Sequence, residues 1–391
     1  MKNELLASRP RIEVADALRG FAIMSIMLLH NIEHFNFYGF PKSTTPFFIA
    51  LDKGIWDTLF FLFSGKSYAI FALLFGFSFF IMFNSREKRG EDFRLRFAWR
   101  MVLLFLIGNI NAAFFPGEVL VQYAIVGLAL IPVCKLNNKT ILIIAVILML
   151  QPVEWGKFFY AIFNPEYVPE RAAYSSLFRE LRSFLAGDSF WAMAKANLWH
   201  GQLFSILFAW ANGRFFQAAS LFMLGFIIGR KALFQNWEEN KRFWKGSLLI
   251  AVACFIPLYF LADALPGFFE RRALLAPMRT IVSTLRNFAF MWTLVALFVW
   301  GWQAVKVQKV LRILSPLGRM SLTNYLMQSI LGAFVYFGFG LGLYNVLTTT
   351  ASFGVGIVLV WFQIIFCQWW LRNHTHGPAE WIWRKGTEIK I

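Results

Sequence analysis

Three polar side chains share one face of the first apolar helix that the sequence predicts. Asp16, Arg19 and His30 belong to the run DALRGFAIMSIMLLH, and at 100° per residue they fall within about 60° of one another. His30 lies roughly 16 Å beyond Arg19 along the helix axis, so it reaches mid-bilayer if Arg19 lies at the cytoplasmic surface. An ionisable side chain at that depth marks a candidate functional site, because a charge inside a bilayer is costly.

Histidine at that position would suit general base catalysis, because the ordinary pKa of imidazole lies near neutrality. His34, one helical turn further on, is a second candidate for the base, and Glu33 or Asp57 is a candidate to orient it. Together with Asp16, the two histidines form the candidate catalytic set. A structural histidine, hydrogen-bonded between helices, is the alternative that the sequence leaves open.

Two arginines at i and i+4 open the third apolar segment, in the run RLRFAWR. Arg96 and Arg100 would face the same way and, beside Arg19, would grip a phosphate at the cytoplasmic entrance. The competing explanation is the positive-inside rule, which supplies basic residues at the inner end of a membrane helix and covers Arg19 equally well. Polar residues on the third and fourth spans, Glu118 and Gln122 among them, either line a cavity or form hydrogen bonds between helices.

The composition is typical of a protein that folds in a lipid membrane. Of its 391 residues, 58% are hydrophobic and 15% are charged, whereas a soluble domain carries about a quarter charged residues. The mean hydropathy is +0.57. The net charge of +17 comes from short basic clusters between apolar runs, so it indicates membrane topology and argues against a nucleic-acid partner. The three cysteines have no CxxC spacing, so neither a disulfide framework nor a metal site is expected.

The apolar runs predict an all-α, polytopic integral membrane protein of about ten transmembrane helices, in one domain over residues 1–391. Every second loop is rich in Lys and Arg, which places both termini in the cytoplasm. The segment 164–202 alternates apolar and charged residues at helical spacing and is expected to lie in the interface on the outer face. The predicted spans cover residues 14–34, 55–83, 96–115, 118–134, 140–162, 203–230, 246–264, 283–303, 318–340 and 350–371.

Several stretches resemble known families of membrane proteins. The DxLRGxA context of Arg19, the ten residues between Arg19 and His30, and the RxxxR of Arg96 and Arg100 are similar to the motif pair of the acyltransferase-3 group. Over nearly its full length the chain resembles the YeiB-like family, a domain of unknown function. One departure is His30, where many YeiB-like members carry Asn, which makes His34 a rival for the catalytic role. The stretches that carry this resemblance are DALRGFAIMSIMLLHNI, KSYAIFALLFGFSF, FFPGEVLVQYAIVG, GRMSLTNYLMQSI and GPAEWIWRKGT.

The resemblance implies an activity as well as a fold. Both groups, with the heparan glucosaminide acetyltransferases, resemble one superfamily that moves acyl groups from cytoplasmic acyl-CoA to acceptors across the membrane. Acyl-CoA, with acetyl-CoA as the first choice, would be held by Arg19, Arg96 and Arg100, and the acceptor would bear a hydroxyl or an amine. The acyltransferase-like helices would lie mainly in 14–163 and the YeiB-like helices in 203–391, on either side of the outer loop 164–202.

The same resemblance implies a multi-pass protein of the bacterial inner membrane, surrounded by the lipid bilayer and using no metal. A transporter or flippase of a lipid-linked or acylated anionic molecule is the alternative, because it would use the same cationic entrance and central cavity without a base. Assembly as a homo-oligomer is left open.

Overall fold

The computed structural model describes residues 11–35, 41–169 and 174–389. Within these ranges the chain is built from helices and contains no strand, which confirms the all-α prediction. The helices are α1 (Glu13–Ile32), α2 (Pro46–Phe63), α3 (Ser67–Glu87), α4 (Arg94–Ala112), α5 (Leu120–Gly127), α6 (Leu130–Val133), α7 (Asn138–Met149), α8 (Pro152–Phe163), α9 (Tyr174–Ala186), α10 (Phe190–Ala196), η2 (Asn197–Gly201), α11 (Gln202–Ala211), α12 (Arg214–Arg230), α13 (Trp237–Phe268), α14 (Arg272–Gly301), α15 (Val305–Leu311), η3 (Arg312–Leu314), α16 (Ser315–Arg319), α17 (Ser321–Tyr336), η4 (Leu343–Asn345), α18 (Thr349–Asn373) and α19 (Pro378–Thr387).

The polytopic character is clear from the length and apolarity of these helices. Among the described residues, five helical stretches can cross a bilayer: Pro46–Glu87, α4, α13, α14 and α18. Counting each of two bent helix pairs as one span raises the number to seven. The other predicted spans coincide with α1, with Leu120–Val133 and with α17, which are shorter or carry more polar residues. The total of ten spans therefore stays a prediction.

The helix surfaces also suit a lipid environment. Helix α13 has 11% of its most apolar window buried inside the protein, and its Ile250 and Phe260 side chains are each 66% exposed. A soluble protein rarely exposes a continuous apolar surface of this extent, whereas lipid tails solvate it well.

Two predicted spans are bent where the backbone leaves the right-handed helical region. The span at 140–162 is two helices, α7 and α8, at 45° to one another, with Gln151 at φ +60° directly before Pro152. The span at 203–230 is bent by 73° where Gly213, at φ +65°, separates α11 from α12. Apolar periodicity does not report such breaks, because residues on both sides remain apolar.

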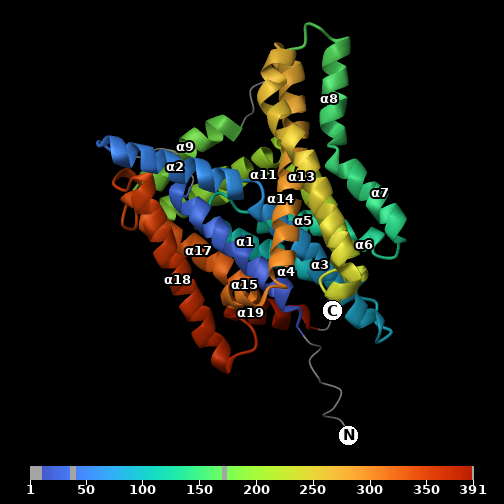
Figure 1. Cartoon of the computed structure of the whole chain (residues 1–391). Coiled ribbons are helices and arrows are strands. Elements are labelled where there is room, and N and C mark those ends of the chain that lie inside the picture. The colour runs from blue at the N-terminus through green and yellow to red at the C-terminus, as the bar shows by residue number, and fades with distance from the viewer. Residues whose placement is uncertain (1–10, 36–40, 170–173, 390–391) are drawn as a thin grey trace.

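Helix α1 lies inside the bundle, against α3, α16 and α18 (Figure 1). Two glycines allow its close crossing with the segment before α17. A Cβ atom on Gly20 would lie 1.9 Å from the carbonyl oxygen of Leu314, and one on Gly318 would lie 1.8 Å from that of Asp16. No larger residue fits at either position, so these glycines set the distance at which the polar face of α1 meets its neighbours.

The two described ends of the chain meet at one end of the molecule. Arg11 Nη2 donates to the carbonyl oxygen of Thr375 at 3.3 Å, so the start of α1 lies beside the link between α18 and α19. We call this the basic end, because Arg11, α15 and α19 bring Lys309, Arg384 and Lys385 there. Figure 1 shows α9, from the segment 164–202, at the opposite end of the molecule. That the basic end faces the cytoplasm stays a prediction.

Candidate functional site

A cavity of about 440 Å³ lies beside the C-terminal end of α1. Its walls come from α1, the junction of α2 and α3, the start of α5, and the helices α9, α11 and α17. Apolar and aromatic side chains form most of the lining, so any polar group in it is exposed to a medium of low dielectric constant. The basic, acidic and amide side chains in the lining are His30, Glu33, Glu118, Gln122 and Arg214.

His30 is held by a neighbouring carboxylate. Its Nδ1 lies 3.0 Å from Oε2 of Glu33, and the ring meets Phe115 edge-on at a centroid distance of 4.9 Å. The His30 side chain is 25% exposed, and that of Glu33 is 7% exposed. A hydrogen bond from Nδ1–H to a carboxylate fixes the ring and makes Nε2 the basic nitrogen. This pair can therefore accept a proton from a group bound in the cavity.

His34 has different surroundings, although it follows His30 by one turn. Its Nδ1 lies 3.0 Å from the carbonyl oxygen of Tyr344 and its Nε2 lies 2.6 Å from Oγ of Ser352. The ring is fully buried and stacks on Tyr336 at a centroid distance of 5.0 Å. His34 is not part of the cavity lining. Both ring nitrogens serve contacts between distant segments, which is the arrangement of a structural histidine.

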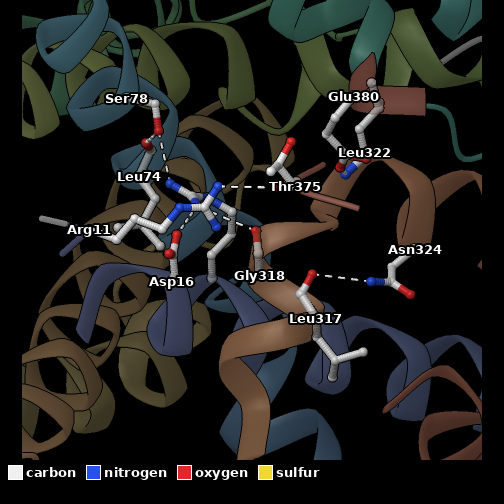
Figure 2. A network of polar contacts seen from close by, with 11 residues as sticks. Arg11, Asp16, Leu74, Ser78, Leu317, Gly318, Leu322, Asn324, Thr375 and Glu380 are labelled. Carbon is white, nitrogen blue, oxygen red and sulfur yellow. Dashed lines mark hydrogen bonds and ion pairs between the residues drawn. The ribbon is translucent and has the colours of Figure 1, made fainter. Parts of the chain in front are cut away.

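Asp16 and Arg19 lie at the other end of α1. Arg19 Nη1 donates to Asp16 Oδ1 at 3.0 Å and to the carbonyl oxygen of Gly318 at 3.4 Å, and its Nη2 donates to Ser78 Oγ at 2.9 Å. Figure 2 shows Asp16, Ser78 and Gly318, the three partners of Arg19, close to one another. Fourteen residues of helix place Asp16 about 21 Å from His30 along the axis. The structure therefore brings Asp16 together with Arg19 and not with either histidine.

The other predicted orienting carboxylate also lies elsewhere. Asp57 Oδ2 accepts a hydrogen bond from Lys53 Nζ at 2.5 Å on the exposed side of α2, and it does not line the cavity. Glu33 is thus the carboxylate that contacts the candidate base.

Arg96 and Arg100 lie in α4, at the basic end. The Arg100 guanidinium carbon lies 3.5 Å from the centre of the Trp383 ring, and Trp383 Nε1 donates to the backbone oxygen of Arg100 at 3.1 Å. Arg96 is half-buried. Neither of these arginines, nor Arg19, lines the cavity that holds His30. The structure therefore separates the predicted phosphate-binding residues from the candidate base.

The charge density of the basic end affects its own histidine. His376 lies in the link between α18 and α19, and its Nε2 is 3.1 Å from Arg384 Nη1. Partial burial and the positive charges of Arg384, Arg11 and Arg319 lower the pKa of His376 below its ordinary value. This end of the molecule therefore repels cations and attracts anions.

Two of the stretches that carry the family resemblance meet at the basic end. Glu380 Oε1 accepts from the backbone N–H of Leu322 at 2.6 Å, and its Oε2 accepts from Thr323 Oγ1 at 2.6 Å. Figure 2 shows Glu380 beside Leu322. A carboxylate there satisfies free N–H groups at the start of α17 and interacts favourably with the helix dipole. GPAEWIWRKGT therefore caps the helix that begins in GRMSLTNYLMQSI.

Sequence reasoning missed one cavity residue, Arg214. Its guanidinium carbon lies 4.9 Å from the centre of the Tyr68 ring and 4.7 Å from that of Phe208. The available signal was a single arginine inside the aromatic-rich run FAWANGRFF, away from every basic cluster. Glu118 and Gln122, which were expected either to line a cavity or to bond between helices, both line this cavity, and Glu118 also accepts a hydrogen bond from Asn111.

Comparison with known proteins gives relatives along the whole chain. A family model described as "Protein of unknown function (DUF418)" matches residues 228–390. The protein YxaH of Bacillus subtilis (strain 168) is 29% identical over 403 residues, covering 97% of this chain and 94% of the relative. YeiB of Escherichia coli (strain K12) is 26% identical over 401 residues, covering 95% of each chain. Together with the all-α membrane architecture, these matches support the resemblance to the YeiB-like family, and the C-terminal part of the chain matches the DUF418 model.

Proposed function

We propose that this protein is a membrane-embedded acyltransferase, which moves an acyl group from acyl-CoA to a hydroxyl- or amine-bearing acceptor. One observation carries the proposal: His30, bonded through Nδ1 to Glu33 at 3.0 Å, lines a cavity of about 440 Å³ inside the helix bundle. A histidine and carboxylate pair facing a largely apolar cavity is an arrangement that suits general base catalysis. The resemblance of the Arg19 and His30 spacing to the acyltransferase-3 motif supports it.

The proposed reaction is balanced in bonds and protons, with His30 carrying the proton between the two substrates. His30 Nε2 removes the proton from the acceptor hydroxyl or amine as its oxygen or nitrogen attacks the thioester carbonyl. The new ester or amide bond forms, the carbon–sulfur bond breaks, and the imidazolium returns the proton to the coenzyme A thiolate. Glu33 stabilises the imidazolium while the proton is held. Such a base contributes about 10²- to 10⁴-fold to the rate.

In this proposal the donor binds from the basic end. The phosphates of coenzyme A contact Arg96 and Arg100, and the pantetheine arm extends along α1 toward the cavity. Replacing both arginines by Ala should weaken coenzyme A binding by about tenfold or more, and the loss should shrink at high salt because the contact is electrostatic. Arg89→Ala, an exposed charge removed beside α3, is the matched control. Unchanged affinity in the double variant would contradict this donor site.

The test of the activity is release of free coenzyme A. Purified protein in lipid nanodiscs receives acetyl-CoA and a panel of hydroxyl and amine acceptors, and the released thiol is titrated. Acceptor-dependent release that disappears in His30→Ala and persists in His374→Ala, an exposed histidine after α18, is the expected result. Release unchanged in His30→Ala would exclude the proposed base. Transbilayer movement of an anionic lipid without any thiol release would favour a transporter or flippase instead.

The proposal also sets an orientation, with the basic end in the cytoplasm of the bacterial inner membrane. A cysteine placed at Asp188, exposed between α9 and α10, should be labelled from outside by an impermeant maleimide, and one at Lys241 in α13 should not. A Cys254→Ser background is needed, because Cys254 is exposed, whereas Cys134 and Cys367 are buried. The reverse labelling pattern would invert the orientation.

A further inference from the structure

The cavity contains a positive charge with no acidic partner. Arg214 is the first residue of α12, and its guanidinium stacks on Tyr68 and Phe208. Within the described part of the chain, Arg214 forms no hydrogen bond and no ion pair. Two aromatic rings hold the guanidinium in place, but they offer no acceptor oxygen to its five N–H donors. Arg214 is half-buried and lines the cavity, so its N–H donors are available to a ligand that presents acceptor atoms.

A second and independent donor lines the same cavity. Gln122 in α5 is 6% exposed, and its Nε2 has no hydrogen-bond partner among the described residues. Most buried amide groups in proteins are paired, so an unpaired one needs an explanation. Gln122 and Arg214 come from different helices, and each has N–H donors without a partner among the described residues. A ligand that satisfies these donors presents acceptor oxygens.

Glu118 also lines the cavity, but both of its carboxylate oxygens already accept hydrogen bonds. Glu118 accepts a hydrogen bond from Asn111 Nδ2 on one carboxylate oxygen and from the backbone N–H of Leu120 on the other. No ion pair links it to Arg214 within the described residues. The charge of Arg214 is therefore available to a molecule that enters the cavity.

The cavity walls indicate what else that molecule carries. Phe60, Phe204 and Phe208 contribute aromatic surface, which suits an apolar portion. Ser175 in α9 lines the cavity and is exposed, so the cavity reaches the surface at the α9 end, opposite the basic end. The ligand thus reaches Arg214 from the side away from the donor arginines.

We propose that Arg214 and Gln122 bind the oxyanion, a carboxylate or a phosphate, of an acceptor that also carries an apolar group and enters from the α9 end. Calling this ligand the acceptor rests on the proposed acyl transfer, whereas the anion site itself does not. The guanidinium supplies charge-assisted hydrogen bonds and the Gln122 amide supplies a neutral one. Anchoring in the cavity that His30 lines would hold the acceptor for deprotonation.

Calorimetric titration without any acyl donor tests the site. The protein is placed in phosphatidylcholine nanodiscs and titrated with glycerol 3-phosphate, glucuronate and dihexanoylphosphatidylglycerol, with glycerol as the neutral probe. We expect at least one anionic probe to bind, glycerol not to bind, and Arg214→Gln to weaken the binding by about tenfold or more. Arg279→Gln removes an exposed charge from α14 and should leave the affinity unchanged. Preference for the lipid or for the soluble anions identifies the source of the oxyanion.

Gln122→Leu separates binding from folding. Because its Nε2 is unpaired, this change should weaken anion binding about threefold or more while leaving the unfolding temperature unchanged or raised. If Arg214→Gln does not fold, Arg214→Lys, which keeps the charge but loses the planar fork, should fold and bind with intermediate affinity. Equal affinity in wild type and in folded Arg214 variants would overturn the anion site, as would wild-type protein that binds none of the three anions.

The two proposals fail separately. Anion binding that depends on Arg214, without coenzyme A release under any condition, would remove the acyltransferase and keep the anion site. Coenzyme A release that depends on His30 but is indifferent to Arg214→Gln would keep the acyltransferase and remove the anion site.

Discussion

His30 and His34 are four residues apart, one in the last turn of α1 and the other just past its end, yet their hydrogen-bond partners and exposure differ. His30 contacts one carboxylate and lines the cavity, with a quarter of its side chain exposed. His34 is fully buried, with one nitrogen on a backbone carbonyl and the other on a hydroxyl. An imidazole with both nitrogens engaged has no lone pair to offer a substrate, so the comparison favours His30 over His34 as the proposed base.

The arginines divide in the same way. The Arg19 guanidinium donates hydrogen bonds to Asp16, Ser78 and Gly318. Arg214 instead has aromatic neighbours and no hydrogen-bond acceptor within the described chain. Both are polar residues in apolar surroundings. What separates a structural polar residue from an available one is the state of its hydrogen bonds, which no spacing in the sequence reports.

The largest effect that we expect from the difference between the two histidines is on turnover. His30→Ala should lower acyl transfer by about two orders of magnitude or more, because the proton-transfer contribution is lost, while coenzyme A binding is retained. His34→Ala should lower turnover per folded molecule by less than about threefold, because its ring does not reach the cavity. The measurement is kcat per molecule of correctly folded protein, counted by size-exclusion chromatography.

His30→Asn sharpens the same test. It removes the basic ring nitrogen but keeps a hydrogen-bonding group beside Glu33. Loss equal to that of His30→Ala would support His30 as the base. Full activity in His30→Asn would instead move the catalytic role to another group.

Much of the fold follows from the sequence, because a run of about 20 apolar residues has few alternatives to a membrane helix. The site follows only in part. The polar face of α1 is visible from periodicity, and so is the place of His30 on it. The choice between the histidines is not, because Tyr344 and Ser352 lie 310 and 318 residues from His34 in the chain.

Arg100 shows the same limit. Its spacing from Arg96 predicts a phosphate grip but does not indicate that Trp383, 283 residues away, stacks on one face of its guanidinium. Arg214 was missed because its significance depends on Gln122, Tyr68 and Phe208, which other parts of the chain bring to it. Contacts of this range depend on the packing of helices, and local patterns carry no information about them.

The carboxylate partner of His30 gives the next largest effect. Glu33→Gln keeps a hydrogen-bond acceptor near Nδ1 but removes the negative charge that stabilises the imidazolium, so turnover should fall by about tenfold or more. Glu33→Asp retains the charge at a shorter reach and should lose less. The measurement is kcat at saturating acetyl-CoA and acceptor. If Glu33→Gln turned over as fast as wild type, His30 would have no need of its carboxylate, and the pair would not be the catalytic unit.

The smallest effect concerns stability and belongs to His34. His34→Ala leaves the buried Ser352 hydroxyl and the Tyr344 carbonyl without this partner, which costs about 1–3 kcal/mol. The residue also has a left-handed backbone, with φ +47°, which alanine adopts poorly. His34→Asn tolerates that backbone and keeps an amide donor, so it should lose less. Thermal unfolding in nanodiscs should place the midpoint of His34→Ala several degrees below wild type and that of His34→Asn between the two. His30→Ala, on the cavity wall, should unfold close to wild type. A midpoint for His34→Ala equal to that of wild type would remove the structural role from His34 and reopen the choice of base.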